Sequence, residues 1–109
     1  MTVQENAAAV LGGNGQPRSQ PRLVFFYSPR DGKSRRVDGY LSQVLQRRHN
    51  HSTFKLLRVD ADKRPDLVAR FNITELPTLL VVDENRVRGR VSQPRGCKQI
   101  TELLHPWLN

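Results

Sequence analysis

A strand–helix–strand pattern between Arg22 and Val59 is the feature that most constrains the fold. Arg22 to Tyr27 is a continuous apolar and aromatic run, which is typical of a strand buried on both faces. Phe54 to Val59 predicts a second apolar strand, although Lys55 and Arg58 interrupt its apolar residues. Between them, apolar residues recur at the spacing of one helical face: Val37, Tyr40, Leu41, Val44 and Leu45. The pattern therefore predicts two parallel strands joined by a right-handed helical crossover.

The second half of the chain predicts a β-hairpin between two helices. Pro65 suits the first turn of a short helix, which is followed by a strand over Thr78–Asp83, a turn at Glu84-Asn85 and a partner strand over Arg86–Val91. A last helix carries an apolar stripe and should end or kink before Pro106; the stripe is Ile100, Leu103, Leu104, Trp107 and Leu108. The order β-α-β-α-β-β-α predicts an α/β fold in three layers, with a mixed four-stranded sheet between helices.

Composition divides the chain near residue 22. The segment 1–21 contains Leu11–Pro17, a cluster of Gly, Asn and Pro that disfavours regular structure, so we expect a flexible tail there and one domain over residues 22–109. The apolar runs are too short to cross a bilayer, and the N-terminal residues lack a signal-peptide pattern. These features predict a cytoplasmic protein that does not act at a membrane.

Two segments resemble the thioredoxin family. The first runs from Val59-Asp60-Ala61-Asp62 through Pro65–Ile73 to Leu76-Pro77-Thr78, and the second is Leu23–Ser28. The resemblance extends over about residues 22–108 and implies a shortened thioredoxin-like fold. It also implies a cis Leu76–Pro77 bond beside the family's active-site turn, where the preceding backbone pairs with an extended partner peptide.

The residues aligned with the family's redox turn lack its chemistry. That turn reads Trp-Cys-Gly-Pro-Cys-Lys in the family and Arg30 to Arg35 here, so that Asp31 replaces the attacking thiol and Ser34 the resolving thiol. Phe25 replaces the buried acid of many thioredoxins. Because dithiol exchange needs both thiols, the chain is predicted not to be a dithiol oxidoreductase, and no cofactor is expected.

Binding to another protein is the predicted function. The resemblance implies that three loops lie together, and they form the predicted binding surface: Arg30, Asp31, Gly32, Lys33, Ser34, Arg35; Glu75, Leu76, Pro77, Thr78; and Gln93–Gly96. The expected partner is an acidic protein or an extended peptide. Two alternatives remain open: a single-thiol or glutathione-handling enzyme that uses the lone cysteine, Cys97, and a KaiB-like regulatory scaffold.

Positive charge gives a further alternative. The chain has 18 Lys and Arg against 10 Asp and Glu, a net charge of +8, which favours either solubility or an anionic partner. Arg86, Arg88 and Arg90 alternate along the last predicted strand, so they are expected on one face with Arg95 and Lys98 nearby. This basic face would protect the sheet edge or bind an acidic protein or nucleic acid. Nucleic acid is disfavoured because no aromatic residue lies between Thr78 and Trp107.

Two weaker motifs complete the set of candidates. Gly32-Lys33-Ser34 matches the end of a phosphate-binding loop, but Tyr27 stands where that motif needs a glycine. Two interpretations remain. One is an anion site at this helix start, where Lys33, Arg35 and Arg36 would add charge, and the other is a solvated first turn capped by Asp31 or Ser34. His49, His51 and His105 lack neighbouring ligands in the sequence, so no metal site is predicted.

Overall fold

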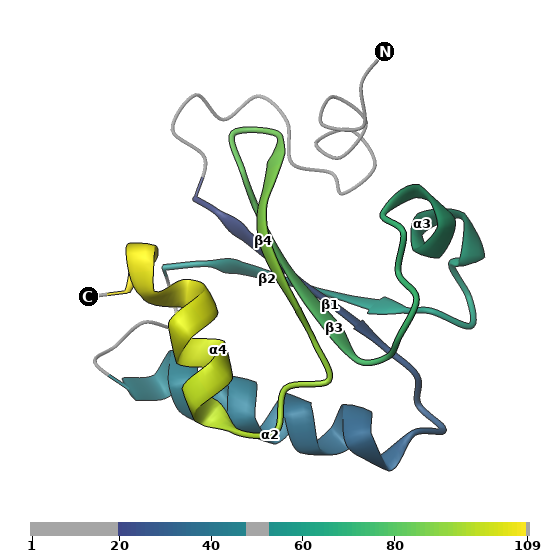
Figure 1. Ribbon diagram of the computed structural model, residues 1–109, viewed down its shortest axis with the longest axis horizontal. Helices are drawn as coiled ribbons and strands as arrows, with labels where there is room; N and C mark the ends of the chain where they lie inside the picture. Colours follow the sequence, from purple (N-terminus) through teal and green to yellow (C-terminus); the bar gives the residue numbers. More distant parts are fainter. Residues whose placement is uncertain (1–19, 48–52, 109) are drawn as a thin grey trace.

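The computed structural model describes residues 20–47 and 53–108, and its elements confirm the predicted order (Figure 1). The strands are β1 (Arg22–Tyr27), β2 (Lys55–Asp60), β3 (Thr78–Asp83) and β4 (Arg86–Ser92). The helices are α2 (Gly32–Gln46), α3 (Pro65–Arg70), α4 (Cys97–Leu104) and the one-turn η2 (His105–Trp107). Residues 1–19 of the expected tail, and His49 and His51, lie outside the described residues.

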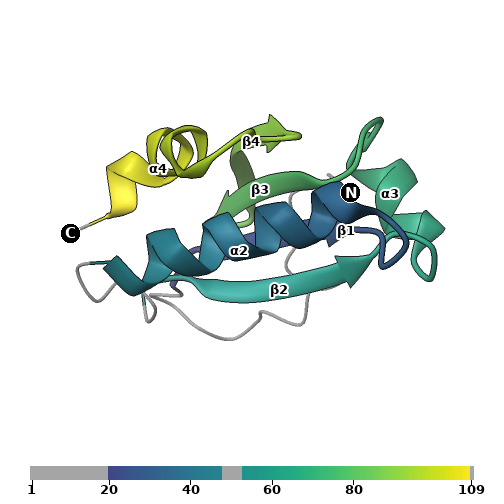
Figure 2. The same ribbon diagram turned by 90° about the horizontal axis from the view of Figure 1, so that it is seen from below.

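The four strands form one mixed sheet in the order β2-β1-β3-β4 (Figure 2). β1 pairs in parallel with β2 and antiparallel with β3, so that Val24 lies between Leu57 and Leu80. β3 and β4 form the predicted antiparallel hairpin. As predicted, a helix connects the two parallel strands. The chain must return from the end of β1 to the start of β2 before β2 can run in the same direction, and this return needs a long connection.

Successive side chains of β1 point to opposite faces of the sheet and contribute to two hydrophobic cores, one on each face. Leu23 and Phe25 face α2 and α4, whereas Val24 and Phe26 face α3, and all four side chains are at most 2% exposed. In Figure 1, α2 and α4 lie on one side of the sheet and α3 on the other. β1 is therefore buried on both faces, which explains why its sequence after Arg22 is continuously apolar and aromatic instead of alternating.

A bulge in the β3–β4 hairpin corrects the predicted face pattern of β4. Glu84 and Asn85 turn the chain with φ values of 54° and 65°, and the register then shifts between Val81 and Val82. Val82 pairs with Val87 and Val81 with Gly89, so Arg88 is the extra residue of β4. The expectation that Arg86, Arg88 and Arg90 share one face is wrong, because the inserted residue breaks the alternation between them.

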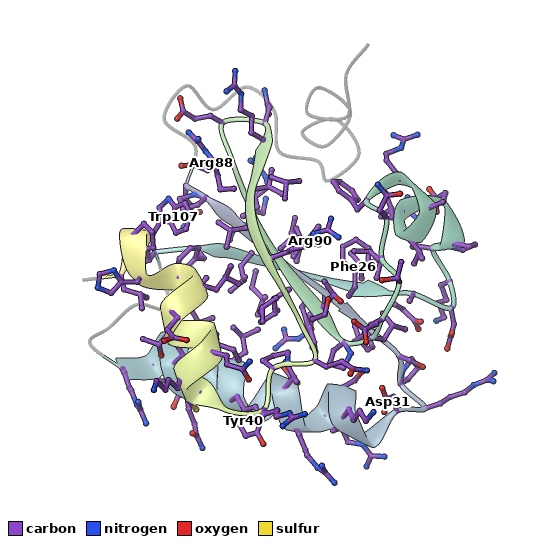
Figure 3. All side chains as sticks on the ribbon, in the orientation of Figure 1. Phe26, Asp31, Tyr40, Arg88, Arg90 and Trp107 are labelled. Atoms are coloured by element: carbon purple, nitrogen blue, oxygen red, sulfur yellow. The ribbon has the colours of Figure 1, made fainter. Side chains whose placement is uncertain are left out.

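The valines of β4 show the consequence of this bulge. Val87 packs with the core on the α3 side, whereas Val91 packs with the core beneath α2 and α4. By register, Arg90 lies beside Leu80 on the α3 side, and Arg86 lies beside Asp83. Figure 3 shows Arg88 near the tip of the hairpin and Arg90 over the middle of the sheet.

The C-terminal helix ends as its proline predicts. The α-helix stops at Leu104, and Pro106 lies within the following 3₁₀ turn. There the indole Nε1 of Trp107 donates a hydrogen bond of 3.3 Å to Asp83, and its ring packs edge-on against Phe54. Within the described ranges, no helix combines the length and apolar character needed to span a membrane.

Leu104 provides a test of this packing. Its side chain is fully buried in the core beneath α2 and α4, so Leu104→Ala should lower the free energy of unfolding by ~2–5 kcal/mol. Urea denaturation followed by circular dichroism measures the change. Glu102→Ala, at an exposed position of the same helix, is the matched control and should change stability by less than about 0.5 kcal/mol. Equal effects of the two substitutions would contradict the described packing of α4.

Candidate functional site

The turn between β1 and α2 is held by polar side chains. Ser28 Oγ accepts from the N–H of Arg30 at 3.3 Å and donates to Asp62 at 3.2 Å. The N–H of Ser28 in turn donates to Ser34 Oγ at 3.1 Å. Ser34 is 4% exposed, so its hydroxyl group is an internal support of the turn and is shielded from solvent.

Asp31 caps the N-terminus of α2. Its carboxylate accepts from the N–H of Lys33 at 3.0 Å, and its carbonyl accepts from the N–H of Ser34 at 3.1 Å. Both bonds satisfy amides that the first turn of a helix leaves unpaired. Of the two capping residues that the sequence offered, Asp31 is the N-cap, and Ser34 lies inside the helix.

The loop before β3 is closed by hydrogen bonds to its own carbonyl groups. The Leu76–Pro77 peptide bond is cis. The carbonyl of Glu75 accepts from Thr78 Oγ1 at 2.7 Å, that of Leu76 from Gln93 Nε2 at 3.1 Å, and that of Pro77 from the N–H of Gln93 at 2.7 Å. No hydrogen bond of the described residues uses the N–H of Leu76. The loop therefore presents a free donor and three occupied acceptors.

Gln93 holds this loop through both of its amide groups. Its backbone has a φ of 49°, which is uncommon for a residue other than glycine. This conformation lets the N–H and the side chain of one residue reach two successive carbonyls of the loop. Gln93 thus ties the β4–α4 connection to the loop before β3.

A groove of about 360 Å³ lies where three loops meet. Its lining comes from α2, from the loop before β3 and from the β4–α4 connection: Lys33, Arg36, Val37, Tyr40, Pro77, Gln93, Pro94 and Arg95. Val37, Pro77 and Pro94 are buried and form its floor. The rim carries the exposed side chains of Lys33 and Arg36 from the helix and of Arg95 from the opposite loop. We call this the basic groove.

The charges of the basic groove are not neutralised within the described part of the chain. Its lining contains no Asp or Glu. Ion pairs among the described residues lie elsewhere and are Arg58–Asp38, Arg64–Asp66 and Arg88–Glu84. The guanidinium of Arg64 donates two hydrogen bonds to Asp66 and thereby lowers the pKa of that carboxyl group, but this pair lies at the start of α3, away from the groove.

A second hollow, of about 350 Å³, lies on another side of α2. Its lining is Phe25, Tyr27, Ser28, Pro29, Ser34, Arg35, Asp38 and Arg58. Phe25 and Tyr27 stack with ring centroids 5.5 Å apart, and Arg58 bonds to Asp38 at 2.9 Å. In contrast to the basic groove, this hollow contains an ion pair that neutralises part of its charge.

The structure separates the predicted site residues into groups. Lys33, Pro77 and three residues of the Gln93–Gly96 loop line the basic groove, whereas Ser34 and Arg35 line the second hollow. Arg30, Asp31, Gly32, Glu75, Leu76, Thr78 and Gly96 line neither. The sequence indicates Arg36 only as an added charge of an anion site at the helix start, and it does not indicate that Val37 and Tyr40 line this groove. Their spacing from Lys33, at i+3, i+4 and i+7, is the signal that would have identified them.

The predicted basic face does not form a continuous site. Arg90 donates to the carbonyls of Phe71 and Asn72, at 2.7 and 3.3 Å, and so supports the end of α3. Arg88 pairs with Glu84 at the hairpin tip. Arg95 belongs to the basic groove, whereas Arg86 and Lys98 are exposed outside it.

Cys97 lies between α4 and α2. It is the first residue of α4 and is half-buried, with Sγ 3.1 Å from Gln43 Oε1 and 3.7 Å from the carbonyl of Tyr40. Figure 3 shows Tyr40 on α2 near the start of α4. Cys97 lines neither the basic groove nor the second hollow. The thiol therefore packs between two helices and does not lie at the turn after β1.

Metal-ligating side chains do not gather in the parts of the chain that the structure describes. No group of three or more His, Cys, Asp or Glu residues there has a geometry that could hold a metal ion. His105 is exposed in the last helical turn.

Sequence comparison matches residues 13–106 to the family model of thioredoxin. The chain belongs to the thioredoxin family. It is 27% identical over 99 residues to a thioredoxin-like protein of Synechocystis, a match that covers 91% of this chain and 86% of the relative.

Solved thioredoxins share the fold at low sequence identity. The thioredoxin-2 of a malaria parasite superposes with a TM-score of 0.74 at 17% identity, covering 86% of this chain and 90% of that one. The thioredoxin of Fasciola hepatica gives 0.72 at 14% identity, covering 94% and 89%. With one cysteine, Cys97, the chain lacks a Cys-x-x-Cys pair.

Arg90 can be tested as a structural residue. Because its guanidinium donates to two carbonyls after α3, Arg90→Gln should lower the free energy of unfolding by about 1–2 kcal/mol. Arg86→Gln is the matched control: it removes an equal charge from an exposed position of the same strand, and it should change stability by less than about 0.5 kcal/mol. Chemical denaturation measures both. If Arg90→Gln had no larger effect than the control, its contacts with α3 would not contribute to stability.

Proposed function

We propose that this thioredoxin-like domain is a redox-inactive adaptor that binds a partner protein at its three clustered loops. The observation that carries the proposal is the basic groove, which is built jointly by α2, the loop before β3 and the β4–α4 connection. Its apolar floor and charged rim suit an extended segment that has both apolar and acidic groups. Unpaired cations would also attract an acidic partner and raise the rate of association.

The loop before β3 supports a modified form of the expected peptide contact. The carbonyls of Glu75 and Leu76 already accept hydrogen bonds from Thr78 and Gln93. A bound segment would therefore accept a bond from the N–H of Leu76 instead of forming a full two-way backbone pair. This favours a ligand that is rich in acceptors, in agreement with the positive charge of the groove.

The chemistry at the turn supports redox inactivity. A dithiol reaction needs one thiolate to attack and a second thiol to resolve the mixed disulfide. The chain has one cysteine, and its sulfur lies between α2 and α4. Asp31 and Ser34 instead form hydrogen bonds that hold the turn in place.

A turnover assay tests redox inactivity. The protein should not reduce insulin disulfides in the presence of dithiothreitol faster than dithiothreitol alone, because neither thiol is present at the turn. The double substitution Asp31→Cys with Ser34→Cys should give weak activity, since position 34 is buried, as suits a resolving thiol, and position 31 is more accessible. Reduction by the unaltered protein above background would contradict the proposal.

A bulky residue at the loops tests the binding surface. Apart from its chain neighbours and the backbone of its own helix, a Cβ atom added at Gly32 would have no heavy atom within 4 Å, so Gly32→Trp can be accommodated and would cover the start of α2 beside Lys33. Linear peptides selected for binding to the unaltered protein should lose affinity by about tenfold or more with this variant. Fluorescence anisotropy with labelled peptides measures the change.

Ala69→Trp is the matched control for this experiment. Ala69 is exposed on α3 and lines neither the basic groove nor the second hollow. This variant should bind the selected peptides as the unaltered protein does. Peptides that bind equally well to both tryptophan variants and to the unaltered protein would show that the three loops are not the binding surface.

A further inference from the structure

The rim of the basic groove carries more positive charge than one carboxylate would neutralise. Lys33 and Arg36 are three residues apart on α2, where like charges repel each other, and Arg95 faces them from the β4–α4 connection. None of the three forms an ion pair with a described residue. Three cationic donors from two elements therefore border one groove whose lining has no acidic residue.

Other donors lie beside these charges. Tyr40 lines the groove one turn beyond Arg36, and its phenol can donate a hydrogen bond. The backbone N–H of Leu76, next to the groove residue Pro77, is unpaired among the described residues. Among the acceptors of the adjoining turn and loop, the Asp31 carboxylate caps α2, and the carbonyls of Leu76 and Pro77 accept from Gln93. The groove thus offers donors and few acceptors.

We propose that the basic groove binds a phosphorylated side chain of the partner protein, through Lys33, Arg36 and Arg95. A phosphoryl group on serine or threonine carries nearly two negative charges and three acceptor oxygens, which matches three cationic donors better than a single carboxylate does. The buried floor of Val37, Pro77 and Pro94 accommodates the apolar part of the same segment. This inference rests on the proposed function and specifies the partner's chemistry.

The lining of the groove favours a phosphorylated peptide over nucleic acid. Single-stranded nucleic acids are bound by several aromatic rings on which successive bases stack. Tyr40 is the one aromatic residue of this lining, and it lies at the helix side of the groove. A volume of about 360 Å³ suits one phosphorylated side chain and its neighbours better than a run of nucleotides.

Three degenerate peptide pools test the inference. Each pool consists of nine-residue peptides with random flanks and a fixed central phosphoserine, serine or glutamate, and binding to the full chain is measured by fluorescence anisotropy at physiological salt. The phosphoserine pool should bind about tenfold or more tightly than the serine pool and more tightly than the glutamate pool. A single-stranded RNA of random sequence is the fourth probe and should bind more weakly than the phosphoserine pool.

Two triple variants with the same charge change locate the contact. Lys33→Gln, Arg36→Gln and Arg95→Gln together should abolish the preference for phosphoserine. The control combines Lys55→Gln, Lys63→Gln and Arg70→Gln, which are exposed positions outside the groove, and should retain it. Circular dichroism of both variants verifies that they are folded, because a general loss of structure would also abolish binding.

The outcomes separate this inference from the proposed function. If the serine and phosphoserine pools bind equally, and Gly32→Trp blocks both, the adaptor function holds and the phosphate inference is wrong. If the glutamate pool equals the phosphoserine pool, the groove binds negative charge without selecting phosphate, and the inference is also wrong. Tighter binding of RNA, or equal losses in both triple variants, would likewise overturn it. Failure of every pool to bind would overturn the proposed function together with the inference.

Discussion

The double pairing of β1 is the constraint on which the rest of the structure depends. β1 bonds to β2 in parallel on one side and to β3 in antiparallel fashion on the other, and its side chains are buried on both faces. Helices must therefore cover both sides of the sheet, because an uncovered face would leave half of this strand in water. Leu23 and Phe25 anchor α2 and α4, and Val24 and Phe26 anchor the region around α3.

The same pairing brings the functional loops together. Since β1 and β3 are antiparallel neighbours, the turn that follows β1 lies beside the loop that precedes β3. β4 is antiparallel to β3, so its C-terminal end returns to this edge of the sheet. The hydrogen bonds of Gln93 then fix the β4–α4 connection to the loop before β3. The basic groove therefore results from the order of the strands in the sheet, and the hydrogen bonds of Gln93 reinforce it.

Positive charge has different roles at different positions of this domain. Arg90 supports the end of α3, and Arg58, Arg64 and Arg88 pair with carboxylates. At the basic groove the charges remain unpaired, which is unfavourable for the isolated domain and favourable for binding an anion. The net charge of +8 therefore does not describe a uniform surface, and function is better inferred from the positions at which cations lack partners.

The sequence by itself determined the elements, their order and the family, because the apolar periodicities of β1, α2 and α4 depend on local spacing alone. It also determined that no thiol stands at the turn, since this is a matter of residue identity. Only the tertiary structure decided which arginines of β4 and of the basic groove form ion pairs. The β4 bulge separates Arg86, Arg88 and Arg90, and the packing of α2 places Arg36 and Tyr40 opposite Arg95. An inserted residue in a ladder and a contact between distant segments leave no periodic signal in the sequence, because both arise from how whole elements pack.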